Sequence, residues 1–364
     1  RRSSDLNQGG LINAPGALLL KNLNGVANQN GEISSAQAFT LDAQSLDNSG
    51  GKLLSNQALT LRLAQAMNNI NGLISAAALD VHSASLDNTD GLLSSHDSLN
   101  LVVDGVLVNH NGTVIADGDL LLNAVTADNS LGQMAGKKDV IANIGSLQQQ
   151  GGQLIAQGTL SLTGDNLDNR QKGLVGATNG LSIKVGNIDN RGGELSSQGV
   201  ISLIGQQLDN SDSGQILGQT TLALTVDNII NRNKGLLSGS SGLSLSGTSL
   251  DNGSGSVLSL HSIDVGLLGT LDNSLGLFSS EGTLGVRVGA LINSAGSLSS
   301  AGALSVSSVA AINNQGGQLV TDGNLDLHSA SLDNSQHGSI SGKGPLLIQT
   351  GAFDNSHKDR KSVV

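Results

Sequence analysis

Residues 46–63 read LDNSGGKLLSNQALTLRL, and this stretch contains the features that decide the fold. It begins with the triplet Leu46-Asp47-Asn48, which is followed by a glycine-rich turn and a short apolar pair, Leu53-Leu54. After a second polar turn, apolar and polar residues alternate strictly from Leu59 to Leu63. A period of two indicates a β-strand with one buried face. The stretch therefore predicts short strands joined by turns, with no room for a helix.

The same pattern recurs along the chain at intervals of 19 to 21 residues. We call the last residue of each triplet the anchor. Sixteen anchors are asparagine: Asn28, Asn48, Asn69, Asn88, Asn109, Asn129, Asn169, Asn190, Asn210, Asn231, Asn252, Asn273, Asn293, Asn314, Asn334 and Asn355. Gln8 and Gln149 are assigned to the anchor position in two further copies. A fixed period of this size is the signature of a solenoid.

We therefore expect an all-β fold, a single-stranded right-handed parallel β-helix of about 17 coils with about 20 residues each. The continuous array is expected to span residues 1–355, and residues 356–364 form an irregular C-terminal tail. A leucine-rich repeat remains an alternative because its period is about 20–29 residues. Its asparagine follows directly on a Leu-x-Leu strand, whereas here several residues separate Leu59-Thr60-Leu61 from Asn69. That difference favours the β-helix.

The composition of the 364 residues agrees with an interior built from aliphatic side chains. Phe39, Phe278 and Phe353 are the only aromatic residues, and glycine occurs 50 times. The net charge is −11 and no basic stripe is visible, so we expect no nucleic-acid partner. Apolar residues are spread too evenly for a membrane-spanning segment. Cysteine is absent, which excludes disulfides and thiolate metal sites.

The anchor asparagines are predicted to form a ladder of buried amides. In a parallel coil, successive strands lie about 4.7–4.9 Å apart, so equivalent side chains form columns. Each asparagine can then donate a hydrogen bond to one neighbour and accept one from the other, as in stacked cross-β structures. A structural role is therefore favoured over a binding role for this column.

The aspartates that precede many anchors would form a second column at the surface. Asp168, Asp189 and Asp209 would lie about 5 Å apart and repel one another. Arginines follow the anchors nearby, with lysines two places later: Arg170, Arg191, Arg232, Lys172 and Lys234. We predict a surface edge of interleaved Asp and Arg, with calcium on the Asp column as the alternative.

No residue pattern indicates a catalytic, cofactor or metal site, so we expect a non-enzymatic chain without cofactors. The seven histidines lack metal-ligand spacing and are expected at the surface: His82, His96, His110, His261, His328, His337 and His357. Serines follow the repeat turns, so none stands out as a nucleophile. The Gly132–Lys138 segment lacks the spacing of a phosphate-binding loop and is expected to mark an irregular coil, as is Gln149.

Two triplets match an N-glycosylation acceptor, Asn111-Gly112-Thr113 and Asn252-Gly253-Ser254. Turn sequences satisfy this pattern often by chance. The chain also starts at Arg1 rather than at a methionine, and we expect an internal segment of a longer polypeptide.

The tandem Leu-Asp-Asn-x-x-Gly-x-Leu-x-Ser units, from about Leu6 to Asn355, resemble the 20-residue repeats of filamentous haemagglutinin. Related large bacterial exoproteins include contact-dependent growth inhibition effectors and HecA-type adhesins. The resemblance implies two-partner secretion through an outer-membrane transporter, and location outside the cell or on the bacterial cell surface. It implies a filament used in adhesion and virulence, with a target-cell receptor as a further partner.

Two functions remain at this point. The first is a structural shaft that extends an adhesin tip or a toxin domain away from the cell. The second is a lateral face that binds a receptor or glycan directly. The near absence of aromatic residues and the constant repeat length favour the shaft.

Overall fold

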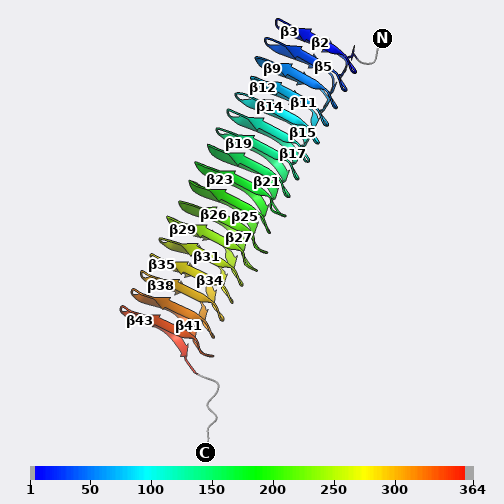
Figure 1. Cartoon of the computed structure of the whole chain (residues 1–364). Helices are drawn as coiled ribbons and strands as arrows, with labels where there is room; N and C mark the ends of the chain where they lie inside the picture. The colour runs from blue at the N-terminus through cyan, green and yellow to red at the C-terminus, as the bar shows by residue number, and fades with distance from the viewer. Residues whose placement is uncertain (1–4, 357–364) are drawn as a thin grey trace, which may run out of the picture. The chain divides into compact units, whose positions relative to one another are not determined.

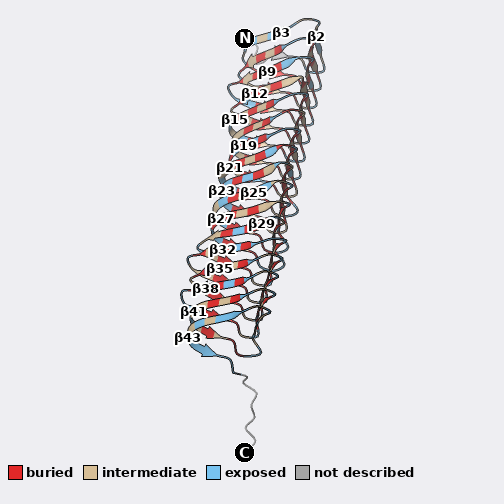
Figure 2. Ribbon diagram, turned by 90° about the vertical axis from the view of Figure 1, so that its left-hand side faces the viewer, coloured by how far each residue is buried: buried red, intermediate tan, exposed pale blue. Residues whose placement is uncertain are grey.

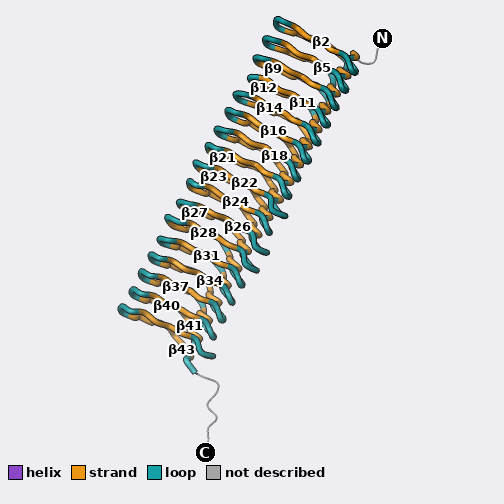
Figure 3. The backbone as a smooth tube through the Cα atoms, viewed as in Figure 1, coloured by secondary structure: helices purple, strands orange, loops and turns teal. Residues whose placement is uncertain are grey.

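The computed structural model describes residues 5–356, and the predicted tail beyond Ser356 lies outside the described residues. The chain divides between Val185 and Gly186 into two compact units, unit 1 and unit 2, and each is described by itself. Every regular element among the described residues is a β-strand. Within each unit the chain coils through strands and turns, and successive coils stack on one another (Figure 1, Figure 3).

One parallel sheet, the short-strand sheet, receives a single four-residue strand from each coil. In unit 1 its strands are β2 (Leu11–Ala14), β5 (Glu32–Ser35), β8 (Lys52–Ser55), β11 (Leu73–Ala76), β14 (Leu92–Ser95), β16 (Thr113–Ala116), β18 (Gln133–Gly136), β20 (Gln153–Ala156) and β22 (Leu174–Ala177). In unit 2 they are β24 (Glu194–Ser197), β26 (Gln215–Gly218), β28 (Leu236–Gly239), β31 (Ser256–Ser259), β34 (Leu277–Ser280), β37 (Ser297–Ser300), β40 (Gln318–Thr321) and β42 (Ser339–Gly342).

The other parallel sheet, the long-strand sheet, receives one long strand or two shorter ones from each coil. In unit 1 these are β1 (Asp5–Leu6), β3 (Leu18–Leu23), β4 (Val26–Ala27), β6 (Phe39–Ala43), β7 (Leu46–Asp47), β9 (Ala58–Leu63), β10 (Ala66–Asn68), β12 (Ala78–Ser83), β13 (Ser85–Asp87), β15 (Leu99–Val108), β17 (Leu120–Asp128), β19 (Val140–Gln148) and β21 (Thr159–Asp168). The strand β23 (Gly180–Asp189) contains the division between the units. In unit 2 they are β25 (Val200–Asp209), β27 (Thr221–Ile230), β29 (Gly242–Gly247), β30 (Ser249–Asp251), β32 (Ile263–Leu267), β33 (Thr270–Asp272), β35 (Leu284–Val288), β36 (Ala290–Ile292), β38 (Leu304–Ser308), β39 (Ala311–Asn313), β41 (Leu325–Asp333) and β43 (Leu346–Asp354).

The register of the strands places equivalent repeat positions directly over one another. Leu59 of β9 pairs with Leu79 of β12, which pairs with Leu99 of β15, and Leu99 pairs with Leu120 of β17. All of these pairings are parallel and advance by one coil. The predicted parallel β-solenoid is therefore confirmed. A second parallel sheet occupies the part of the coil where a leucine-rich repeat has a helix or 3₁₀ turn, which excludes that alternative.

The interior is filled by the apolar positions of the alternating strands. Leu59, Leu61 and Leu63 of β9 are buried, whereas Arg62 between them points outward. Figure 2 shows the same alternation of buried and more exposed residues along the long strands. Each fully buried leucine contributes roughly 1.5–3 kcal/mol, so the columns supply most of the driving force for stacking. Phe39 and Phe278 also lie in the interior, where they are fully buried among aliphatic side chains.

The predicted irregular coil at Gly132–Lys138 was wrong. The strand β18 pairs residue by residue with β16 before it and β20 after it. Gly136 ends β18 in register with Ala116 and Ala156, and Lys137 and Lys138 lie in the exposed turn that follows, where many polar residues are tolerated. The described residues contain no helix with the length and apolarity needed to span a membrane.

Candidate functional site: a buried amide ladder and a charged edge

The anchor asparagines point into the coil and hydrogen-bond to one another from coil to coil. In unit 1, Asn7 donates through Nδ2 to Oδ1 of Asn28, and the chain of bonds continues through Asn48, Asn69, Asn88 and Asn109 to Asn129. In unit 2 it runs from Asn190 through Asn210, Asn231, Asn252, Asn273, Asn293, Asn314 and Asn334 to Asn355. The side chain of Asn109 is 0% exposed, and its Nδ2 lies 2.6 Å from Oδ1 of Asn129.

The same amides also bind the backbone of the turn that follows each anchor. Asn109 Nδ2 lies 3.1 Å from the carbonyl oxygen of Gly112 and 3.2 Å from that of Gln133 in the next coil. An asparagine amide offers two donors and one strong acceptor, and this site uses all three. An aliphatic residue would remove the amide donor from these carbonyl groups and from Oδ1 of Asn129, and would leave Nδ2 of Asn88 without its acceptor Oδ1, which explains why the repeat retains a polar residue in its interior.

The two glutamines assigned to the anchor position, Gln8 and Gln149, occupy different places in the structure. Gln149 takes the anchor position as predicted, because its Oε1 accepts from Nδ2 of Asn129 at 2.9 Å and its Nε2 donates to the carbonyl of Leu174. The assignment of Gln8 was wrong. Asn7 is the anchor of the first coil, and Gln8 instead binds the exposed Gln29. The two ends of the predicted ladder also differ, because Asn355 accepts from Asn334 but is exposed.

The glycine in the turn that follows the anchor, such as Gly112 after Asn109, leaves the space that the amide ladder needs. A Cβ atom on Gly112 would lie 2.2 Å from the carbonyl oxygen of Asn88 and 2.6 Å from Oδ1 of Asn109. Both distances are far shorter than van der Waals contact, and neither atom is at the end of a flexible surface chain. Glycine at this position therefore allows two successive coils to approach closely.

A second set of buried polar groups was not recognised in the sequence. Ser55, at the end of β8, is buried, and its hydroxyl donates to the carbonyl of Gln37 in the preceding coil at 2.7 Å. The same hydroxyl accepts from the backbone N–H of Gln57. Ser95 and Ser259 make equivalent bonds to Ala77 and Gly239. The signal in the sequence is the serine seven residues after several of the anchors, as after Asn48, Asn88 and Asn252.

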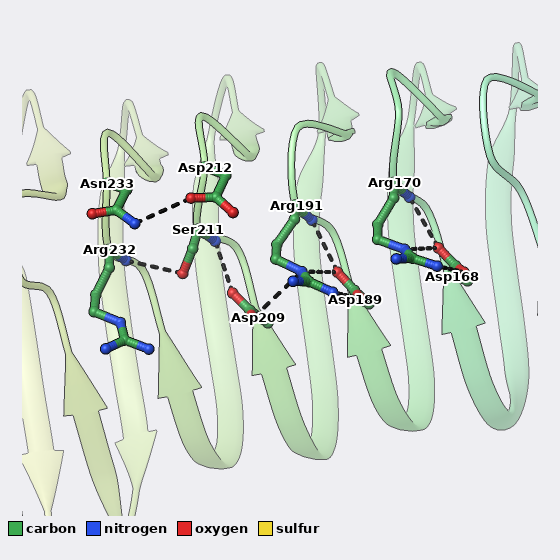
Figure 4. A network of polar contacts seen from close by, with 9 residues as sticks. All are labelled: Asp168, Arg170, Asp189, Arg191, Asp209, Ser211, Asp212, Arg232 and Asn233. Carbon is green, nitrogen blue, oxygen red and sulfur yellow. Dashed lines mark hydrogen bonds and ion pairs between the residues drawn. The ribbon is translucent and has the colours of Figure 1, made fainter.

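The aspartates that precede the anchors support the turns and pair with arginine. Asp47 accepts hydrogen bonds from the backbone N–H and the hydroxyl of Ser49, which is an Asx-type turn. In unit 1, Arg170 takes the place of that serine, and its guanidinium lies 2.7 Å from Asp168 (Figure 4). The backbone requirement explains why aspartate recurs even where no arginine neutralises it.

In unit 2, arginine connects aspartates of successive coils. The guanidinium of Arg191 lies 2.7 Å from Asp189 in its own coil and 3.6 Å from Asp209 in the next coil (Figure 4). Arg232 pairs with Asp251 at 3.4 Å in the same way. The hydrogen bond to Asp189, together with the charges of Asp189 and Asp209, raises the pKa of Arg191. The predicted edge of interleaved Asp and Arg is confirmed at these positions.

A comparison with known protein families gives seven overlapping matches to the haemagglutinin repeat, at residues 2–62, 43–109, 97–164, 163–221, 205–266, 262–315 and 307–357. The chain belongs to the haemagglutinin repeat family. Neither the comparison with curated proteins nor the comparison with solved structures gave a match. In this haemagglutinin repeat chain, the buried ladder recurs from coil to coil and belongs to the repeat itself, whereas the Asp–Arg pairs of the charged edge lie around Arg170, Arg191 and Arg232.

The remaining charged residues do not gather into a metal or catalytic site among residues 5–356. Arg170 and Arg191 occupy the positions beside the Asp column where calcium was the alternative, and this arrangement does not favour a divalent cation. Within the described residues, Lys172 and Lys234 form no salt bridge, so the predicted edge contains arginine but not these lysines.

The histidines of this haemagglutinin repeat chain lie at turns or on outward strand positions. His82 pairs with Asp104 at 3.0 Å, and His328 pairs with Asp326 at 3.0 Å. His96 lies 3.7 Å from Asp117, and the hydrogen bond from Lys137 lowers the pKa of that carboxyl. These are contacts between exposed side chains, which contribute little to stability. His357 lies outside the described residues.

We expect Asp168→Asn to reduce the stability of the chain slightly at neutral pH and not in acid. Partial burial raises the pKa of Asp168, but hydrogen bonds from Arg170 and Gln150 outweigh it and keep that pKa below its ordinary value. The contribution is therefore present above the unfolded-state pKa and is lost as the pH falls through the folded-state pKa. We expect a loss of about 0.2–1 kcal/mol at neutral pH, measured by urea denaturation.

The matched control is Asp165→Asn, because Asp165 is exposed and forms no salt bridge within residues 5–356. This variant should match the unmodified chain at both pH values. If Asp168→Asn caused the same loss in acid as at neutral pH, the ion pair would not be its cause.

Proposed function

We propose that this haemagglutinin repeat array is the structural shaft of a secreted, cell-surface filamentous protein. The shaft would hold an adhesin tip or a contact-dependent toxin domain away from the producing cell. Family membership supports an adhesin-like rather than an enzymatic role. The proposal assigns no cofactor and no nucleic-acid partner to this segment.

The observation that carries the proposal is that the recurring residues make their contacts with neighbouring coils. The residues that recur from coil to coil are the anchor amides, the interior aliphatic residues and the turn glycines, and all of them contact neighbouring coils or allow their close approach. These residues make their hydrogen bonds and close contacts with neighbouring coils. A repeat in which the constant residues stabilise stacking suits a spacer, because the number of coils sets its length.

The outward positions support the same interpretation. Along one outward column of the long-strand sheet in unit 1, the residues are Thr60, Asp80, Asn100, Leu121, Ile141 and Ser161. Their chemistry changes from coil to coil, between charged, polar and aliphatic. A face that bound a repetitive ligand would need the same groups in each coil, and this column does not provide them.

We also propose that the amide ladder fixes the register between coils. A shift of one residue would turn every side chain of a strand to the opposite face. The buried anchor resists that shift, because only one residue per coil can complete the row of amides. Register must be correct for each coil that is added, so a chain exported by two-partner secretion could fold coil by coil as it leaves its outer-membrane transporter.

Deletion of whole repeats in the full-length parent protein tests the shaft. Removal of residues 232–273 joins Asn231 to Ser274 and deletes two periods between the anchors Asn231 and Asn273. Residues 49–88 provide an equivalent deletion in unit 1. We expect both variants to be displayed at the surface and to remain adhesive or toxic, with a reach about 10 Å shorter.

The control removes residues 232–262, which places Ile263 directly after an anchor and breaks the register. This variant should lose folded protein at the surface. Loss of adhesion in an in-register deletion that is still displayed and folded would contradict the shaft, and would instead favour a binding face on the deleted coils.

A further inference from the structure

The two N-glycosylation triplets of the chain lie in very different surroundings. Asn252 is a ladder residue with 0% exposure, and its Nδ2 donates to Oδ1 of Asn273 and to the carbonyl of Gly255. Its nitrogen is inaccessible in the folded coil. Asn111, by contrast, lies two residues after the anchor Asn109, at the exposed tip of the turn. The structure therefore separates two triplets that the sequence alone cannot distinguish.

The side-chain nitrogen of Asn111 is available for a covalent bond. Among the described residues its one hydrogen bond is to Oδ1 of Asp90, at the tip of the preceding coil. The nitrogen has two protons, so this bond can persist when the other proton is replaced. Thr113, the third residue of the triplet, lies on the outward side of β16, and its hydroxyl makes no hydrogen bond within residues 5–356.

The surface beside Asn111 is hollowed. The hollow has a volume of about 310 Å³, and Thr113, Leu131, Gln133, Gly151 and Gln153 contribute to its lining. Leu131 provides an apolar surface, and the amides of Gln133 and Gln153 provide donors and acceptors. A sugar ring has the matching properties, because its C–H face is apolar and its rim consists of hydroxyl groups. The hollow has space for one such ring.

Leu131 presents an apolar side chain at the tip of the turn in the next coil. It is 63% exposed and has a left-handed backbone with φ of 58°. The same turn has glycine in some coils, as at Gly50, and a non-glycine residue in others, as at Leu275. Leu131 lies with Asn111 in the lining of the hollow, so a ring attached to Asn111 could cover its exposed apolar surface.

We propose that Asn111 is a glycan attachment site and that its first sugar lies in the hollow formed by Leu131, Gln133 and Gln153. The co-substrate is a diphosphate-activated sugar, delivered by a glycosyltransferase. A bond forms between Nδ2 and the anomeric carbon, and the bond from that carbon to the phosphate oxygen breaks. The diphosphate leaves with the electron pair, Nδ2 loses one proton to a base of the transferase, and the other N–H remains next to Asp90.

Mass spectrometry of peptides from the protein as its native producer makes it tests the attachment. We expect the sugar on Asn111 and none on Asn252. Thr113→Ser should retain the sugar, Thr113→Ala should lose it, and Ser254→Ala should change nothing. An unmodified Asn111, or a modification that persists in Thr113→Ala, would overturn the proposal.

The position of the first sugar is tested by enzymatic removal from the folded protein. We expect Leu131→Gly to speed removal, because the ring loses its apolar support. The matched control is Leu275→Gly in unit 2. Leu275 has the same left-handed conformation and exposure, but the equivalent turn of the preceding coil has Ser254 and no amide. Equal rates of removal in the two variants would show that the hollow does not hold the sugar.

Discussion

Gly255→Ala is expected to destabilise the folded chain by about 3 kcal/mol, more than most surface substitutions could. A Cβ atom at this position would lie 1.8 Å from the carbonyl oxygen of Asn231 and 2.6 Å from Oδ1 of Asn252. The first atom belongs to the backbone of the preceding coil and the second to the buried ladder. Neither can move without separating two coils, so the clash acts on both the close approach and the row of amides.

The measurement is the urea midpoint of the full chain, followed by circular dichroism. Gly266→Ala is the matched control, because a Cβ atom there meets nothing within 4 Å and Gly266 lies in β32 of the same unit. We expect the control to stay within about 0.5 kcal/mol of the unmodified chain. If both variants unfolded at the same urea concentration, the turn glycine would not be needed for coil contact.

Much of the fold could be predicted from the sequence because each position of the repeat occurs in many copies. Strict alternation, as in Leu59 to Leu63, identifies a strand with one buried face, and the period places equivalent residues in columns. The amide row follows from those columns, because a polar side chain that must be buried in every coil can be satisfied by its own equivalents. The Asp168–Arg170 and Asp189–Arg191 pairs follow from proximity in the sequence alone.

Other features could not be read from single positions. The first coil reads Leu6-Asn7-Gln8, without an aspartate directly before Asn7, so the triplet does not identify Asn7 as the anchor. The segment around Gly132 looked unusual because turn positions tolerate many residues, yet the strands beside them stay in register.

Serine hydroxyls and the left-handed turns were missed for a different reason. Ser55 is small and polar, and its residue type does not indicate whether its hydroxyl faces solvent or the carbonyl of Gln37. Leu131 at positive φ is contrary to ordinary turn preferences and is set by the stacking of the coils above and below it. Such features depend on the neighbouring coils, which a local pattern does not show.

Asn109→Asp is expected to be as damaging as the glycine substitution, although it exchanges one amide nitrogen for oxygen. The carboxylate still accepts the hydrogen bond from Asn88, but it can no longer donate to Asn129, Gly112 or Gln133. These three acceptors lose the amide as a donor, although the Gly112 carbonyl still accepts from the backbone N–H of Gln133, and each buried acceptor left unsatisfied costs about 1–3 kcal/mol. A buried charge next to these oxygens adds to the penalty.

The loss should also depend on pH in a defined direction. Burial and the facing oxygens raise the folded-state pKa of the new carboxyl above its unfolded value. The native state therefore takes up a proton more readily than the unfolded state, and the penalty shrinks as the pH falls through the raised pKa. A protonated carboxyl has one O–H, which can restore the hydrogen bond to Asn129.

The most direct measurement of the ladder is the difference in urea midpoint between Asn109→Asp and Asn143→Asp at neutral and acid pH. Asn143 also donates to an asparagine of the preceding coil, Asn123, and accepts from Thr163, but it is exposed. We predict that Asn109→Asp loses about 3 kcal/mol or more at neutral pH and recovers part of it in acid, while Asn143→Asp changes little. Equal midpoints for the two variants at neutral pH would contradict the buried amide ladder as the structure that holds successive coils in register.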